Sequence, residues 1–153
     1  MNHAATSSAP ALHIRRLLKA PRTRVFDAWT KAEAVRQWMG PLDVTVTEAQ
    51  LDVREGGSFR IVMRQPDGDD FIARGIFSEV REPERLVYTW RWEEDDPALE
   101  HETFITVEFL ERGEQTELVF RQVAFASTES RDRHEYGWTH CFDKLEGLLA
   151  TAA

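Results

Sequence analysis

Residues 134–149 read HEYGWTHCFDKLEGLL and carry the clearest helical pattern in the chain. Apolar or aromatic side chains recur there every three or four residues, and charged side chains cover the other side. The apolar side is made of His134, Trp138, Cys141, Phe142, Leu145, Leu148 and Leu149. A helix with so apolar a face has to pack against another layer. We therefore expect a long C-terminal helix that covers one face of a sheet.

The segment before this helix has a period of two, which is typical of β-strands. Alternating apolar residues begin at Val44 and return on successive segments as far as Phe125. Short turns separate these segments, for example GG (56–57), PDG (66–68) and RGE (112–114). Connections this short join antiparallel neighbours, because a parallel crossover needs a dozen residues or more. We therefore expect a meander of six strands.

The N-terminal part predicts one further strand and two short helices. Residues 12–18 form an apolar stretch typical of a strand, and Pro21 suits the first turn of a helix. Thr30 has Glu33 three residues on, the pattern of a capping box, which predicts the start of a second helix there. That helix is expected to end at GP (40–41).

Length and composition fit one globular domain. The chain has 153 residues, of which 42% are hydrophobic and 30% charged. Residues 1–10 are small and polar, so we expect a disordered leader followed by one domain over residues 11–153. No apolar run reaches the roughly 18 residues that span a bilayer, and the start lacks the pattern of a secretory signal. We expect a cytoplasmic protein with no membrane partner.

The charge of the chain argues against nucleic acid as a partner. The sequence has 27 acidic and 19 basic residues, a formal net charge of −8, whereas phosphate binding needs clustered Lys and Arg. Cys141 is the one cysteine, so no intramolecular disulfide is possible. Both a monomer and a homodimer are compatible with the sequence.

Six motifs, spread over residues 12–149, occur in a characteristic order. They are VFDAWT (25–30), WMGP (38–41), GGSFR (56–60), PDG (66–68), PERLVYTW (83–90) and GW (137–138). In these motifs the chain resembles the activator-of-heat-shock-protein-ATPase homologue family of the START-like, or SRPBCC, superfamily. The resemblance implies an α+β helix-grip fold, in which a curved antiparallel sheet wraps round a long C-terminal helix and two short helices follow the first strand.

The resemblance implies three classes of function. Family members include a co-chaperone module that stimulates a chaperone ATPase, small-molecule binders and cyclases, and they share no catalytic motif. Since a fold hosts many functions, the choice has to come from the site. Our leading expectation is a protein, rather than an enzyme, that binds a hydrophobic or aromatic small molecule in an internal cavity. The alternatives are a chaperone-regulating module in a stress response and a cyclase- or hydratase-like enzyme.

The expected cavity lies between the sheet and the long helix, because ligand sites are mostly apolar with a few polar groups. Its predicted lining is Trp38, Phe59, Ile61, Met63, Tyr88, Trp90, Phe104, His134, Trp138 and Phe142. His134 is open to two interpretations. It is either a group that orients a ligand or transfers a proton, or a histidine that bonds a backbone carbonyl at the start of the helix.

Other polar residues give weaker signals. Cys141 lies among apolar neighbours and is interpreted as packing. His134 and His140 are six residues apart and no Cys pair exists, so no metal, cofactor or catalytic set is expected. The acidic run of residues 93–102 is expected to be a solvated hairpin tip. Four charged strand residues face either inward or outward, and the sequence leaves this open for Arg74, Glu79, Glu108 and Arg121.

Overall fold

The computed structural model describes residues 10–151. Its strands are β1 (Ala11–Leu18), β2 (Thr45–Leu51), β3 (Ser58–Arg64), β4 (Asp70–Arg81), β5 (Arg85–Trp92), β6 (Thr103–Arg112) and β7 (Gln115–Val123). Its helices are α2 (Arg22–Thr30), α3 (Ala32–Trp38) and α4 (Thr128–Thr151), with a 3₁₀ turn η1 at Pro97–Leu99. The predicted leader over residues 1–10 lies, except for Pro10, outside the described residues.

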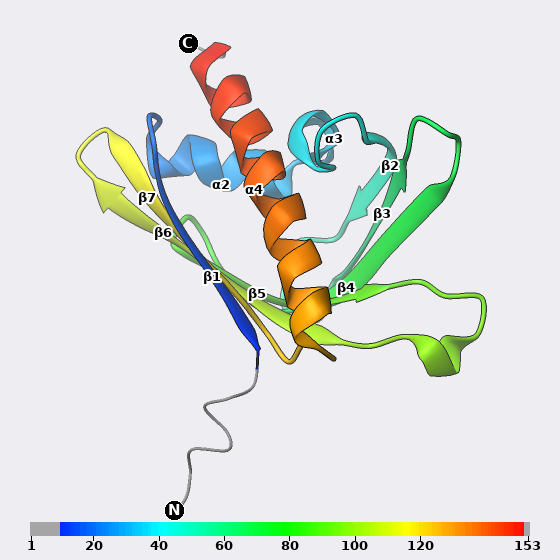
Figure 1. The fold of residues 1–153 in the computed structure, drawn as a ribbon. Coiled ribbons are helices and arrows are strands. Elements are labelled where there is room, and N and C mark those ends of the chain that lie inside the picture. Colours follow the sequence, from blue (N-terminus) through cyan, green and yellow to red (C-terminus); the bar gives the residue numbers. More distant parts are fainter. Residues whose placement is uncertain (1–9, 152–153) are drawn as a thin grey trace, which may run out of the picture.

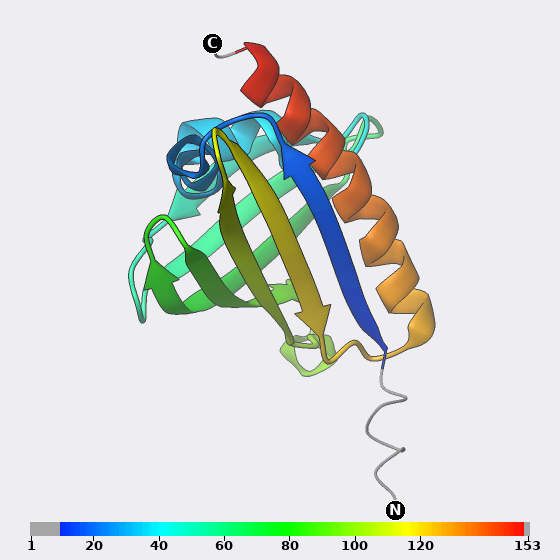
Figure 2. The same cartoon turned by 90° about the vertical axis from the view of Figure 1, so that its left-hand side faces the viewer.

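The seven strands form one antiparallel sheet in the order β1-β7-β6-β5-β4-β3-β2. Strands β2 to β7 follow one another as a meander, and β1 pairs with β7 to complete the sheet. The sheet curves, and α4 lies along its concave side with α2 and α3 next to the C-terminal part of α4 (Figures 1 and 2). The predicted α+β helix-grip fold is confirmed.

Strand alternation divides the sheet into two chemically different faces. On β5 the inner face carries Leu86, Tyr88 and Trp90, all buried, while Arg85 and Arg91 lie on the outer face. The same division continues across β6 and β7, where the inner positions are buried and apolar and the outer positions are largely polar. The core therefore lies between the inner face and the helices.

Helices lie against both edge strands of the sheet. At one edge α4 runs beside β1, and the guanidinium Nε of Arg131 donates to the carbonyl of Ala11 at 2.9 Å (Figure 2). At the other edge α3 packs against β2. A covered edge offers few free backbone groups to a further strand.

The predicted capping box at Thr30 is wrong. Thr30 is the last residue of α2, and its hydroxyl donates to the carbonyl of Phe26 in the preceding turn at 2.9 Å. Lys31, which is extended with φ −94° and ψ 127°, separates the helices and makes no side-chain cap. A hydroxyl bonded one turn back in its own helix is not available to the next one.

Candidate functional site

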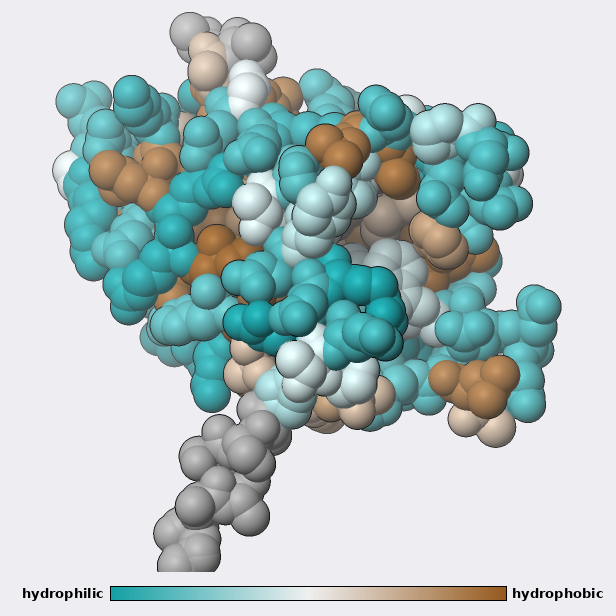
Figure 3. All heavy atoms as spheres, viewed as in Figure 1, coloured by the Kyte–Doolittle hydropathy of each residue, from teal (hydrophilic) through white to brown (hydrophobic). Residues whose placement is uncertain are grey.

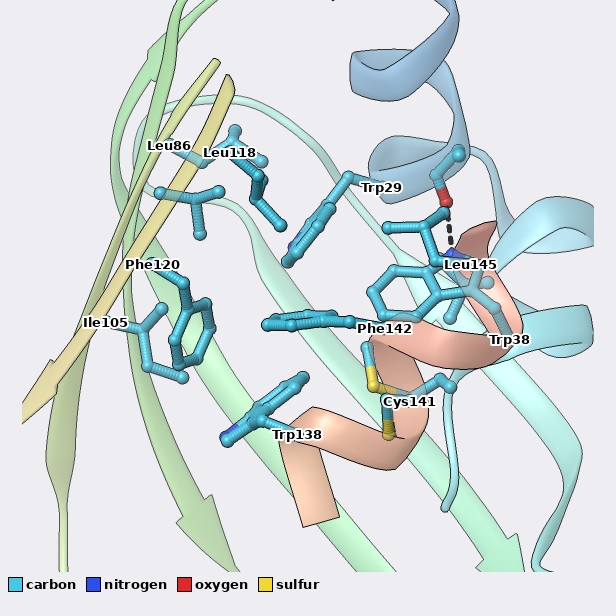
Figure 4. Close-up of a cluster of buried hydrophobic side chains, with 14 of the residues drawn as sticks. Trp29, Trp38, Leu86, Ile105, Leu118, Phe120, Trp138, Cys141, Phe142 and Leu145 are labelled. Atoms are coloured by element: carbon cyan, nitrogen blue, oxygen red, sulfur yellow. Dashed lines mark hydrogen bonds between the residues drawn. The ribbon is translucent and has the colours of Figure 1, made fainter. Parts of the chain in front are cut away.

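The space between the sheet and α4 has two ends, and we call the one next to α2 and α3 the closed end. The rings of Trp29 and Trp38 lie 4.7 Å apart between their centroids, and the ring of Phe142 lies 5.6 Å from Trp29. Figure 4 shows Phe142 and Trp38 pointing toward the same interior. The indole of Trp38 donates to the carbonyl of Ala28 at 2.8 Å, and that of Trp29 to the hydroxyl of Tyr88 at 3.2 Å. Both indole N–H groups here are satisfied.

The other end lies between β5, β6, β7 and the N-terminal half of α4, and we call it the polar end. It is formed by Trp90, Trp92, Thr103, Gln122, His134 and Trp138. The ring of Trp138, on α4, lies 5.0 Å from Trp90 and 4.8 Å from Phe120 on the sheet. Aromatic side chains, rather than closely approaching backbones, therefore connect α4 to the central strands here.

Gln122 is the centre of a buried hydrogen-bond network at the polar end. Its side-chain oxygen accepts from the indole of Trp138 at 2.9 Å, and its amide donates to the hydroxyl of Thr103 at 2.8 Å. The hydroxyl of Thr103 in turn donates to the backbone carbonyl of Trp90 at 3.0 Å. Gln122 is 0% exposed, so each of these bonds compensates for lost hydration. Each oxygen of the network, on Gln122, Thr103 and the Trp90 backbone, accepts a hydrogen bond.

The indole N–H of Trp90 is not part of that network. Within residues 10–151 it is the one buried side-chain nitrogen or oxygen without a hydrogen-bond partner. Trp90 is 3% exposed, and its ring lies between those of Phe59, Trp92 and Trp138, at 5.9, 5.4 and 5.0 Å. Leaving a donor buried and unpaired costs about 1–3 kcal/mol. Such a group in a folded interior calls for an explanation.

His134 has two partners and no carboxylate. Its Nδ1 lies 2.7 Å from the carbonyl of Ser130 in the preceding turn, and its Nε2 accepts from the indole of Trp92 at 2.9 Å. These contacts fix the neutral tautomer with the proton on Nδ1. Burial lowers the pKa of His134, which also keeps the ring neutral. Of the two predicted roles, the contacts match the histidine that bonds a backbone carbonyl.

Two further titratable groups are held in their protonated forms. Burial raises the pKa of the Cys141 thiol to about 12, so that it carries no thiolate near neutral pH, as expected for a packing residue. Burial also raises the pKa of Tyr88. The Tyr88 oxygen accepts from Trp29, and its own hydrogen has no acceptor within the described residues.

The structure gathers nine of the ten predicted cavity residues on the inner side of the sheet. Eight of them are buried, and His134 is partly buried: Trp38, Phe59, Ile61, Met63, Tyr88, Trp90, Trp138 and Phe142 are 0–5% exposed. Phe104 is the exception, since it lies on the outer face and is 45% exposed. Its register partner on β5 is Thr89, an outer-face residue, so the next residue, Ile105, faces inward instead.

Two open depressions are lined mainly by polar and charged side chains. One, of about 400 Å³, lies at the β1–β7 side and is lined by Arg15, Arg16, Leu17, Arg112, Gln115 and Glu117. The other, of about 240 Å³, is lined by Gln50, Leu51, Asp52, Ser58, Phe59 and Arg60. The surface is also hollowed beside α4 on the side of β2 and β3, and apolar side chains show in this hollow (Figure 3). Neighbouring aromatic rings of the interior lie in contact, for example Trp29 and Trp38 at 4.7 Å and Trp90 and Trp138 at 5.0 Å between centroids.

The outer face of the sheet carries an arginine ladder that the sequence did not reveal. Arg60, Arg74 and Arg91 are register neighbours on β3, β4 and β5. Glu100 reaches back to two of them, with oxygen–nitrogen distances of 2.6 Å to Arg74 and 3.5 Å to Arg91. Burial acts to raise the pKa of Glu100, but the backbone N–H of Glu94 and these guanidinium groups outweigh it and lower the pKa.

The strand charges that the sequence left open belong to this outer side. Glu108 pairs with Arg85 at 3.0 Å, and Glu79 pairs with the same arginine at 3.3 Å. Arg121 is exposed and is the register partner of Thr106 on β6. The acidic run is in part an exposed tip, as expected, yet Glu100 is anchored, with a side chain only 4% exposed. None of these groups enters the interior.

A metal site and a membrane span are both missing from the described part of the chain. Residues 10–151 contain no group of three or more His, Cys, Asp or Glu side chains placed to hold a metal ion. No helix within the same range is long and apolar enough to cross a bilayer.

Comparison with known proteins gives a family and a set of similar structures. The family model described as activator of Hsp90 ATPase homolog 1-like protein matches residues 19–150. The AHSA1 protein of Silicibacter pomeroyi is similar in structure with a TM-score of 0.84, at 25% identity, over 94% of this chain and 100% of that one. A protein of Nitrosomonas europaea has a TM-score of 0.77 at 25% identity, over 92% and 94% of the two chains.

A third similar structure shows the fold alone. A protein of Chromobacterium violaceum has a TM-score of 0.83 at 23% identity, over 91% of this chain and 96% of that one. No curated protein matches the sequence.

Proposed function

The chain belongs to the family of activator of Hsp90 ATPase homolog 1-like proteins, and from this premise we propose that it binds a hydrophobic, aromatic small molecule at the polar end of its interior. The observation that carries the proposal is the unpaired indole N–H of Trp90. A ligand with an acceptor atom at this place would remove the cost of about 1–3 kcal/mol that the buried donor imposes.

The surroundings of Trp90 suit an aromatic ligand. The rings of Phe59, Trp92 and Trp138 offer faces and edges within 6 Å of its own ring. Aromatic pairs contribute about 0.5–1.5 kcal/mol beyond the area that they bury. An inserted ring would therefore replace existing ring contacts by similar ones and gain a hydrogen bond.

The contacts of α4 favour opening at the polar end rather than at the closed end. The C-terminal half of α4 is fixed by charged groups: Lys144 donates to the carbonyl of Gly40 at 2.6 Å, and Arg16 pairs with Asp143 at 2.8 Å. At the polar end, α4 is connected to the central strands by neutral hydrogen bonds, which are weaker than charge-assisted ones, and the charge-assisted bond from Arg131 to the Ala11 carbonyl reaches only the edge strand β1. They run from Trp138 to Gln122 and from Trp92 to His134.

The proposal is tested by titrating the protein with prodan, an uncharged aromatic fluorophore with a carbonyl acceptor. We expect saturable binding of one molecule per chain and a blue shift of its emission, since the site is apolar. The five tryptophans provide an internal control in nitrogen–proton correlation spectra, with indole signals assigned by single Trp→Phe variants.

The signals of Trp90, Trp92 and Trp138 are expected to move with prodan, while those of Trp29 and Trp38 at the closed end stay in place. A fluorescence increase that rises in proportion to prodan without saturating would refute the proposal. Equal movement of all five signals would place the ligand elsewhere and refute it as well.

A second candidate is regulation of a chaperone ATPase, as the family description suggests. The observation that favours it is an exposed apolar row on the outer face, where Ile76 (54% exposed) and Phe104 (45% exposed) lie on either side of Thr89. Exposed apolar side chains that lie together are typical of interaction sites. The ATPase rate of the cognate Hsp90 with the wild-type chain and with Phe104→Ser tests it, and an unchanged rate with the wild-type chain excludes it.

A cyclase- or hydratase-like activity has less support. Such an enzyme needs an acid–base pair that faces the same interior. His134 is bonded to Trp92 and to the Ser130 carbonyl, and Glu100, whose side chain is only 4% exposed, is paired with Arg74 and Arg91 on the outer side of the sheet.

A further inference from the structure

We propose that the ligand of the polar end is an uncharged aromatic compound that carries a hydrogen-bond acceptor and no donor, as an aromatic ketone does. This inference rests on the proposed function and specifies which member of the broad hydrophobic class the site selects. Three features of the interior support it: its lack of charge, its excess of donors, and the rings around Trp90.

The interior provides no partner for a charged ligand. The buried polar residues within the described part of the chain are Thr103, Thr116 and Gln122, all of them neutral. Arg16 points toward α4, where Asp143 and Glu146 already pair with it. A carboxylate or an ammonium group would therefore lose its hydration without a counter-ion, which is strongly unfavourable. The site should select against charge of either sign.

Donors outnumber acceptors among the interior side chains. Trp90 has an unpaired N–H, and the hydroxyl hydrogen of Tyr88 has no acceptor within residues 10–151. The side-chain acceptors at the polar end each already accept one hydrogen bond, Gln122 from Trp138 and Thr103 from Gln122. A ligand that brings an acceptor satisfies the free N–H of Trp90. A ligand that brings a donor has to share an acceptor that is already bonded.

The position of the free donor fixes which part of the ligand carries the acceptor. The indole N–H of Trp90 belongs to a ring in contact with three others, so an atom that bonds it has to be attached to a flat group that fits among these rings. A carbonyl conjugated to an aromatic ring has this shape.

The test compares naphthalenes that differ in one substituent at the same ring position. Acetylnaphthalene has a carbonyl, isopropenylnaphthalene has the same shape with a methylene group in place of the oxygen, naphthol adds a donor, and naphthoate is an anion. We expect acetylnaphthalene to bind about three- to tenfold more tightly than isopropenylnaphthalene, which is the effect of one hydrogen bond. Naphthol should bind less tightly than acetylnaphthalene, and naphthoate least tightly.

Variants connect the preference to the proposed donor. In Trp90→Phe, acetylnaphthalene and isopropenylnaphthalene should bind equally, because the N–H is gone. In Trp29→Phe, which removes an indole N–H from the closed end, the preference should persist. The ligand pair tests the donor preference in the wild-type protein even if Trp90→Phe does not fold. The indole proton of Trp90 should also shift downfield with acetylnaphthalene and not with isopropenylnaphthalene.

The outcomes separate the two proposals. If none of the four compounds and no prodan binds, the proposed function fails. If isopropenylnaphthalene binds as tightly as acetylnaphthalene, or if naphthoate binds most tightly, the binding function stands and the inference about ligand chemistry is overturned. A preference for acetylnaphthalene that survives in Trp90→Phe also overturns it, because the acceptor would then pair with another group.

Discussion

The closed end and the polar end of the interior are both built from tryptophan and phenylalanine, but they differ in how their polar atoms are used. At the closed end both indole N–H groups have partners, and α4 is fixed there by charged side chains. At the polar end one indole has no partner, and neutral hydrogen bonds connect α4 to the central strands, while Arg131 bonds only the edge strand β1. Similar composition thus leaves both indole N–H groups paired at one end and one indole N–H unpaired at the other.

The two ends should differ most in how much stability is lost when an aromatic ring is removed from each of them. Trp38 is 0% exposed and packs against Trp29 and Phe142, so Trp38→Ala should lower the free energy of unfolding by about 3–5 kcal/mol. Trp92 at the polar end is only partly buried, so Trp92→Ala should cost clearly less. Urea unfolding of both variants measures the difference. Equal losses would show that the two ends contribute alike to stability.

Loss of the buried amide should be the next largest effect. Gln122→Met keeps the approximate volume of the side chain but leaves the indole N–H of Trp138 without an acceptor, which should cost about 1–3 kcal/mol. The double variant Gln122→Met/Trp138→Phe removes that donor too and should recover part of the loss. Thermal or urea unfolding of Gln122→Met, Trp138→Phe and the double variant gives the coupling free energy between the two residues. Strict additivity would contradict a direct bond between the two residues.

His134 should make a smaller contribution to stability, and this contribution should depend on pH. Because burial holds the pKa of His134 below its usual value of 6.5, the unfolded chain takes up a proton at this residue before the folded chain does. Stability should therefore fall as pH drops through about 6.5, and the loss should be complete below the folded-state pKa. Protonation of Nε2 would also break the hydrogen bond from Trp92, because two N–H donors would then face each other.

The control for this pH effect is His134→Gln, which accepts a hydrogen bond but does not titrate. The melting temperatures of the wild type and the variant are measured from about pH 7.5 to 5. The melting temperature of the wild type should fall further than that of the variant as the pH is lowered. Parallel curves would show that His134 contributes nothing to the pH dependence. The fluorescence of Trp92 should respond in the same pH range in the wild type alone.

The sequence predicted the elements of the fold because each depends on a local pattern. The period of α4 placed Trp138 and Phe142 on its buried side, and the alternation of β5 placed Tyr88 and Trp90 together. Phe104 was misplaced because it was judged by its own apolar side chain, although Thr106 and Glu108 share its phase while Ile105, Val107 and Phe109 form the apolar one. The register with β5 agrees with this alternation, since Phe104 lies opposite Thr89. A local pattern therefore places a strand residue only when the whole alternation of the strand is used.

The unpaired donor could not be predicted at all. Whether Trp90 finds an acceptor depends on the side chains that other strands and α4 bring next to it, and none of the described residues supplies one. The anchoring of Glu100 by Arg74 and Arg91 likewise depends on how a loop folds back over the sheet. Such pairings follow from three-dimensional neighbours that are distant in sequence, so composition and spacing do not specify them.

The smallest predicted effect tests whether α4 has to move when ligand enters. Gly147 and Gly137 lie in the helical segment at the closed and polar ends, and a glycine inside a helix costs about 1 kcal/mol relative to alanine. A methyl group on Gly147 meets nothing within 4 Å, and one on Gly137 meets only Pro41 at an ordinary 3.9 Å. Each Gly→Ala variant should therefore be about 1 kcal/mol more stable in urea unfolding.

The two variants should nevertheless differ in binding. Gly147→Ala stiffens the half of α4 that Lys144 and Arg16 already fix, so its affinity for prodan should equal that of the wild type. Gly137→Ala stiffens the half next to Trp138, and its prodan association rate should fall if α4 has to bend for the ligand to enter. Equal association rates in both variants would mean that the ligand enters by rearrangement of side chains alone, with the helix backbone in place.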